Sequence, residues 1–106
     1  MAYYLVSADI KENKLNDLKD RVNTGELKKL SPFGKAITYS LKNARYDTDS
    51  GRALWEEEDY CSPPLAQEKS EVLYDYFEDI QEEKVSKGEG WKQIKDLPKL
   101  WQEMPS

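Results

Sequence analysis

One stretch of the chain, residues 52–65, constrains the fold more than any other. Its first part, Arg-Ala-Leu-Trp-Glu-Glu-Glu-Asp, predicts a strand over residues 52–59 that becomes acidic toward its end. Ser62 and Pro63 then form a helix-start signal, because serine is a preferred N-cap and proline fits the first helical position. The stretch also contains Cys61, the only cysteine of the chain. We therefore expect the most distinctive chemistry of the protein at this junction of strand and helix.

The length of the chain bounds its architecture. With 106 residues it has the usual size of a single domain. Such a domain buries only about two thirds of its unfolded surface, so the core is modest and dimerisation would enlarge it. No segment approaches the roughly 20 apolar residues that cross a bilayer, and neither a secretory signal nor a pair of cysteines is present. These features predict a cytoplasmic protein without a membrane segment.

Hydrophobic periodicity predicts the remaining elements of the chain. Alternating apolar residues indicate strands, and apolar residues at spacings of three and four indicate helices. A run of turn formers, Asp-Thr-Asp-Ser-Gly, joins two of the strands into a hairpin. The predicted strands are residues 2–9, 36–46, 52–59 and 81–85, and the predicted helices are residues 11–22 and 63–80, with a further helical turn over residues 26–30.

The order of these elements is strand, helix, strand, strand, helix, strand, which is the split βαβ pattern. We therefore predict an α+β fold, namely a ferredoxin-like βαββαβ domain with an antiparallel sheet over residues 1–85. Residues 86–106 are predicted to form a linker and a docked, short helical tail. In element order and length the chain resembles the dimeric α+β barrels, which include muconolactone-isomerase-like, YCII-like and small monooxygenase-like proteins. This resemblance implies a homodimer in which the open faces of two sheets enclose a barrel interior.

Charge is unevenly distributed along the chain. Residues 47–83 contain 13 acidic and two basic residues, whereas the rest contains eight acidic and 14 basic ones. An acidic middle argues against nucleic-acid binding, which requires clustered lysine and arginine side chains against phosphates. It is compatible with a basic protein partner. The simpler alternative is an acidic, solvated face that keeps the protein in solution.

The chain contains no histidine. This excludes the commonest general base and metal ligand, and every catalytic pair of histidine with serine or cysteine. With a single cysteine a zinc site is not expected, and no glycine-rich phosphate loop precedes a helix. We therefore expect no metal and no cofactor. Cys61 has acids beside it and no histidine partner, which favours a structural role over a nucleophilic one.

Six side chains are candidates for contact with a small organic ligand. In the predicted barrel one face of each strand points into the interior, where a polar lining with tyrosines suits a small molecule. Two of the acids share this face about 7 Å apart, and such a pair can make one carboxyl group a general acid. The alternative is that these side chains fill the interior or hydrogen-bond across the dimer. The six candidates are Tyr3, Ser7, Asp9, Tyr39, Glu56 and Glu58.

Four further side chains are candidates for binding a protein partner. The acids among them have an alternative role as charged groups that protect an edge strand from aggregation. The tryptophans have an alternative role as anchors that cover apolar surface. Arg45 and Arg52 flank the predicted hairpin, where they form either a salt bridge or an anion clamp. The four candidates are Glu57, Asp59, Trp91 and Trp101.

Two hypotheses about function follow from the sequence. The first is a small homodimeric binding or assembly module, which the absence of histidine and of cofactor motifs favours. The second is a small cofactor-free enzyme, isomerase-like or monooxygenase-like, acting on a small organic acid or aromatic in the barrel interior. Loss of a small molecule on substitution of Asp9 or Glu56 would favour the enzyme. Loss of a protein partner on charge reversal at Glu57 or Asp59 would favour the module.

Overall fold

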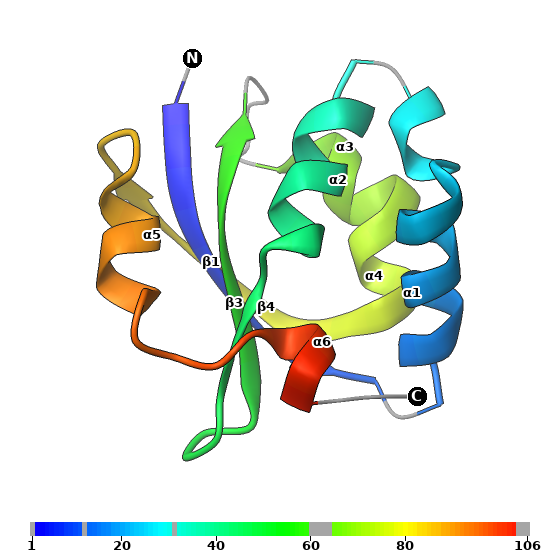
Figure 1. Ribbon diagram of the computed structural model, residues 1–106. Coiled ribbons are helices and arrows are strands. Elements are labelled where there is room, and N and C mark those ends of the chain that lie inside the picture. The colour runs from blue at the N-terminus through cyan, green and yellow to red at the C-terminus, as the bar shows by residue number, and fades with distance from the viewer. Residues whose placement is uncertain (1, 12, 31, 60–64, 104–106) are drawn as a thin grey trace.

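The computed structural model describes residues 2–11, 13–30, 32–59 and 65–103. They form an α+β domain with a four-stranded antiparallel sheet in the order β2-β3-β1-β4, which confirms the predicted class. Most helices cover one face of this sheet, and α5 lies on the other side (Figure 1). The strands are β1 (Ala2–Ile10), β2 (Arg45–Asp47), β3 (Arg52–Asp59) and β4 (Phe77–Val85). The helices are α1 (Leu15–Thr24), η1 (Leu27–Lys29), α2 (Gly34–Lys42), α3 (Ala66–Glu68), η2 (Lys69–Leu73), α4 (Tyr74–Tyr76), α5 (Glu89–Ile94) and α6 (Leu100–Glu103).

The sheet contains two pairs of parallel strands, and each pair has a strand of the other pair between its members. β3 lies antiparallel to both β1 and β2, so β1 and β2 run in the same direction with β3 between them. β4 is also antiparallel to β1, so β3 and β4 run in the same direction with β1 between them. The helical segments connect the strands of each parallel pair across one face of the sheet (Figure 1).

The core lies between the sheet and these helices. Val6 and Ala8 of β1 are paired directly with Trp55 and Ala53 of β3, and all four residues are fully buried. The ring of Trp55 packs against Phe77 with 5.1 Å between ring centroids. Since direct partners in a sheet share a face, the period of two along both strands creates one continuous apolar surface. The strands predicted at residues 2–9 and 52–59 are confirmed.

The strand predicted over residues 36–46 is wrong. This segment forms the helix α2, and only the three residues of β2 are extended. Ile37 and Leu41 are fully buried, and Tyr39 between them is 63% exposed. The pattern misled because Ile37 and Leu41, four positions apart, lie on one face of either a strand or a helix. Residue 39 distinguishes the two structures, since a strand would have buried it with its neighbours.

The start of α2 packs closely against η1. A Cβ atom at Gly34 would overlap the carbonyl oxygen of Leu27 and lie 2.7 Å from that of Lys28. The amide of Gly34 also donates to the carbonyl of Leu30 at 2.6 Å. The absence of a side chain at residue 34 therefore allows these two backbone segments to meet.

The helix predicted over residues 63–80 ends earlier than expected. It ends at Tyr76 and includes a π-helical segment, η2. β4 then begins at Phe77, four residues before the predicted strand. The Phe77 ring is buried there and packs against the ring of Trp55. A bulge opposite residues 7–9 of β1 places Asp79 at a φ of +50°. The predicted N-cap Ser62, together with Pro63 and Cys61, lies outside the described residues.

The C-terminal tail contacts both faces of the sheet. α5 packs against β3 and β1 on the face opposite the main core. The following segment runs along the outer edge of β2, where Tyr46 donates its amide to Pro98 and Leu100 donates to Ala44, both at 2.9 Å. Leu100 then enters the main core on the helix side. α5 therefore occupies part of the sheet face that the resemblance assigns to a second copy of the chain.

Within the described residues, no helix combines the length and the apolar character required to cross a lipid bilayer.

Substitution of Gly34 by alanine tests the contact between α2 and η1. Alanine normally stabilises a helix interior relative to glycine by roughly 0.5–1 kcal/mol. Here we expect the opposite sign, a loss of about 1–3 kcal/mol in the free energy of unfolding, because backbone atoms must move to admit the methyl group. Urea denaturation measures the change. Lys35→Ala, at the exposed next position, is the control, and a stabilised Gly34→Ala protein would contradict the packing described here.

Candidate functional site

The carboxylate of Glu56 holds α5 against the sheet. It accepts hydrogen bonds from the amides of Gly88 (2.9 Å), Gly90 (2.8 Å) and Trp91 (3.4 Å). The side chain is only 5% exposed, and these amides lie at the start of α5, where a helix lacks internal partners. A Cβ atom at Gly90 would lie 2.9 Å from a Glu56 carboxylate oxygen, so glycine permits this approach. Glu56 therefore caps a helix whose N-cap residue, Gly88, lies 32 residues further along the chain.

The backbone of Glu56 is held from the other side by α2. β2 pairs only with residues 52–54 of β3, so the outer edge of β3 beyond Leu54 has no strand partner among the described residues. At this edge the hydroxyl group of Ser40, which is buried, donates to the carbonyl of Glu56 at 2.6 Å. One residue of β3 thus connects α2 on its edge with α5 on its face.

A cleft of about 600 Å³ lies between these elements, within the usual range of about 300–1,000 Å³ for small-molecule sites. Its walls come from the start of β1, the second half of β3, α2 and the segment that leads into α5. The lining residues are Tyr3, Pro32, Lys35, Ala36, Tyr39, Ser40, Glu56, Glu58, Lys87, Gly88 and Trp91.

Aromatic rings form much of the cleft wall. The rings of Tyr39 and Trp91 are nearly perpendicular, with an interplanar angle of 86° and 6.3 Å between centroids. This edge-to-face arrangement is a preferred contact of aromatic pairs. Tyr3 contributes a third ring from β1, directly opposite Glu58 of β3 in the sheet register. The exposed Lys35 and Lys87 also line the cleft.

The structure brings together four of the six predicted ligand residues, Tyr3, Tyr39, Glu56 and Glu58. Tyr39 reaches the cleft from a helix and not from the predicted strand. Glu56 lines the cleft, but its carboxylate binds the amides of α5. The sequence interpretation missed Lys35 and Lys87, which lie in segments without a recognisable motif.

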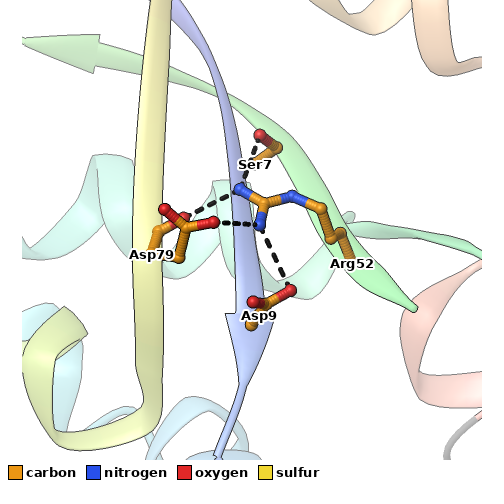
Figure 2. Close-up of polar contacts among 4 residues, drawn as sticks. All are labelled: Ser7, Asp9, Arg52 and Asp79. Atoms are coloured by element: carbon orange, nitrogen blue, oxygen red, sulfur yellow. Dashed lines mark hydrogen bonds and ion pairs between the residues drawn. The ribbon is translucent and has the colours of Figure 1, made fainter. Parts of the chain in front are cut away.

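The other two predicted ligand residues, Ser7 and Asp9, belong to a separate network around Arg52 (Figure 2). The Arg52 guanidinium group donates to the Ser7 hydroxyl at 3.1 Å and to the Asp9 carboxylate at 3.2 Å. It also donates to the carboxylate of Asp79 at 3.0 Å and to its carbonyl at 2.8 Å. Arg52 therefore joins three strands at the bulge of β4. For Arg52 the sequence predicted either a salt bridge within the hairpin or an anion clamp, and the observed network is neither. Arg45, the other arginine of that prediction, donates to the carbonyl of Leu97 at 2.8 Å.

The two acids predicted to face a protein partner are buried, and this corrects the expectation that they lie on the surface. Glu57 is 0% exposed and Asp59 is 2% exposed, because they follow Trp55 at intervals of two and point toward the helices. Trp55 donates its indole N–H to Glu57 at 3.1 Å, and the Leu65 amide donates to Asp59 at 2.6 Å. The second carboxylate oxygen of each acid has no hydrogen-bond partner in the described part of the chain.

Burial raises the pKa of Glu57 well above its ordinary value of 4.5. The negative charge of the buried Glu68 raises this pKa further, whereas the hydrogen bond from Trp55 lowers it. Removing a carboxylate from water disfavours its charged form unless a cation or several donors compensate. Folding therefore shifts the Glu57 carboxyl group toward its protonated form relative to the unfolded chain.

The two predicted partner-binding tryptophans have contacts within the chain. Trp91 packs against Tyr39 at the cleft, whereas Trp101 of α6 donates its indole N–H to the carbonyl of Leu41 at 2.7 Å. Both are half-buried against the core. Trp101 thus adds a hydrogen bond from α6 to a carbonyl in the last turn of α2 that also accepts the Ala44 amide at 3.3 Å.

No three histidine, cysteine, aspartate or glutamate side chains of the described residues are grouped so that they could hold a metal ion. Comparison of the chain with protein-family models, with curated proteins and with solved structures finds no match in any of the three. The resemblance to dimeric α+β barrels therefore stays a prediction.

Removal of the Glu56 carboxylate tests its role as a cap. In Glu56→Ala we expect a loss of about 2 kcal/mol in the free energy of unfolding, the usual contribution of hydrogen bonds to a charged group. The amides of α5 should also exchange with solvent faster than in the wild type, which hydrogen-exchange NMR measures. Glu83→Ala removes an exposed carboxylate from the same sheet face and serves as the control. Equal protection of α5 in both variants would show that Glu56 does not hold the helix.

The pH dependence of stability tests the state of Glu57. Because the folded pKa is raised, the folded protein binds more protons than the unfolded chain as the pH rises above about 4.5, so stability falls in that range. We expect Glu57→Gln to be more stable than the wild type near neutral pH, and the two to converge below about pH 4.5. Urea denaturation across this range gives both curves. A constant difference at every pH would contradict the assignment, and Glu83→Gln is the matched control.

Proposed function

We propose that the protein is a binding module whose cleft between α2 and α5 takes a small organic molecule with a planar aromatic group. The observation that carries the proposal is the aromatic wall of the cleft, formed by Tyr3, Tyr39 and Trp91. Tyr39 is 63% exposed beside Trp91, so a bound ring would remove apolar surface of both from water. Apolar and aromatic walls with few polar groups are typical of small-molecule sites.

The polar groups of the cleft support binding over catalysis. The Glu56 carboxylate already accepts three amides, and the Ser40 hydroxyl already donates to a backbone carbonyl. The enzyme hypothesis named Asp9 and Glu56 as candidate liners of one interior, but Asp9 binds Arg52 and does not line the cleft. A non-catalytic module agrees better with these existing hydrogen bonds and ion pairs.

For the fold, we propose the ferredoxin-like assignment with α2 as an additional helix. The interleaved parallel pairs of strands support it, because each is a split βαβ unit. We propose that a single copy binds the ligand, because β1, β3, α2 and the segment leading into α5 together give a cleft of about 600 Å³, a size usual for small-molecule sites. The homodimer expected from the sequence is a separate prediction, which native mass spectrometry measures.

Titration with neutral aromatic probes, such as indole and naphthol, tests the proposed function. We expect shifts in amide NMR spectra at the cleft residues and at the indole N–H of Trp91. Tyr39→Ala should weaken binding by about fivefold, since loss of one ring contact is worth on the order of 1 kcal/mol.

Tyr74→Ala is the matched control, because Tyr74 is the other large exposed aromatic side chain of the described residues and does not line the cleft. Equal weakening by both variants, or no shift at the cleft with any probe, would contradict the proposed function.

A further inference from the structure

We propose that the natural ligand of this cleft is a planar aromatic anion, such as an aromatic carboxylate. Its ring would lie against Tyr39 and Trp91, and its negative group would face Lys35 and Lys87. The inference rests on the proposed function and adds the charge of the ligand. It depends on which charged groups of the cleft are already paired and which are not.

The two lysines are the unpaired cations of the cleft. Lys35 lies in the first turn of α2, and Lys87 lies just before α5, so they reach the cleft from opposite sides of its aromatic wall. Both are exposed, and neither forms a salt bridge with another residue of the described ranges. Lysine recognises an anion as a compact point charge, without the fixed geometry that arginine imposes.

The two acids that line the cleft, Glu56 and Glu58, repel a bound anion less strongly than two uncompensated carboxylates would. Glu56 is compensated by three backbone amides at distances of 2.8–3.4 Å, so much of its charge is neutralised locally. Glu58 is half-buried and has an interaction of its own. With Glu56 compensated, the two lysines outnumber Glu58, the one other acid of the lining, so the balance available to a ligand is positive although the whole chain has a net charge of −5.

The aromatic wall alone does not decide the sign of the ligand. Tyrosine and tryptophan rings also attract cations through their negative faces, so an ammonium compound is the natural rival. The lysines decide between the two, because they repel a cation placed at the same rings and attract an anion. Since both lysines are exposed, their attraction is modest and should weaken as salt is added.

Three probes with the same ring system test the sign of the ligand: naphthoate, naphthamide and naphthylmethylammonium. Their dissociation constants are measured by NMR titration or calorimetry at low and at high salt. We expect naphthoate to bind about fivefold more tightly than naphthamide at low salt, and the ammonium compound to bind most weakly. Added salt should remove most of the advantage of naphthoate.

Variants then test the two lysines directly. Replacing both Lys35 and Lys87 by methionine should lower the affinity for naphthoate about fivefold and leave that for naphthamide unchanged. The matched control is Lys42→Met with Lys92→Met, which removes exposed lysines of α2 and α5 that do not line the cleft. Unfolding curves of both double variants confirm that the fold is retained.

The outcomes separate this inference from the proposed function. If naphthamide or the ammonium compound binds as tightly as naphthoate, the inference is overturned and the aromatic cleft stands. If naphthoate binds best but the Lys35 and Lys87 variant does not affect it, the assigned anion contacts are wrong. If none of the three probes binds in the cleft, the proposed function fails as well.

Discussion

Consecutive residues of β3 point to opposite faces of the sheet, and this alternation divides four neighbouring acids between two environments. Glu57 and Asp59 share the face of Trp55 and are buried with it beneath the helices. Glu56 and Glu58 share the other face, where the cleft and α5 lie. Most other features of the molecule depend on this division, because each pair of acids meets different neighbours.

On the face that carries the cleft, a carboxylate holds the structure together. α5 has only six residues, and helices of this length are unstable by themselves in water. The carboxylate of Glu56 accepts hydrogen bonds from the first amides of α5. Its negative charge also interacts favourably with the positive, N-terminal end of the helix dipole. In that position α5 places Trp91 beside Tyr39. The aromatic wall of the cleft, and with it the proposed binding function, thus depends on a buried acid that is not free to react.

On the sheet face that the helices cover, a buried glutamate lowers the stability of the folded protein. Glu57 receives one indole N–H, and its other oxygen has no partner within the described ranges, so its charge is poorly compensated. Arg52 presents the contrasting case, because it brings Asp9 and Asp79 together around one guanidinium group at the bulge. The acidic composition of the chain therefore contributes to the fold where donors meet the carboxylates, and opposes it where apolar side chains do.

Local sequence pattern determined the strands β1 and β3, because each holds a short run of aromatic and aliphatic residues and β3 directly follows a turn signal. It also determined that residues 56 and 58 share one face and residues 57 and 59 the other. It could not decide between strand and helix for residues 36–46, since Ile37 and Leu41 satisfy both periods, and packing against η1 made this segment a helix. Nor could it decide which pair of acids is buried, or bring Lys35 to the cleft with Lys87. The physical reason is that periodicity assigns residues to faces, whereas only contacts between distant segments decide which face is removed from water.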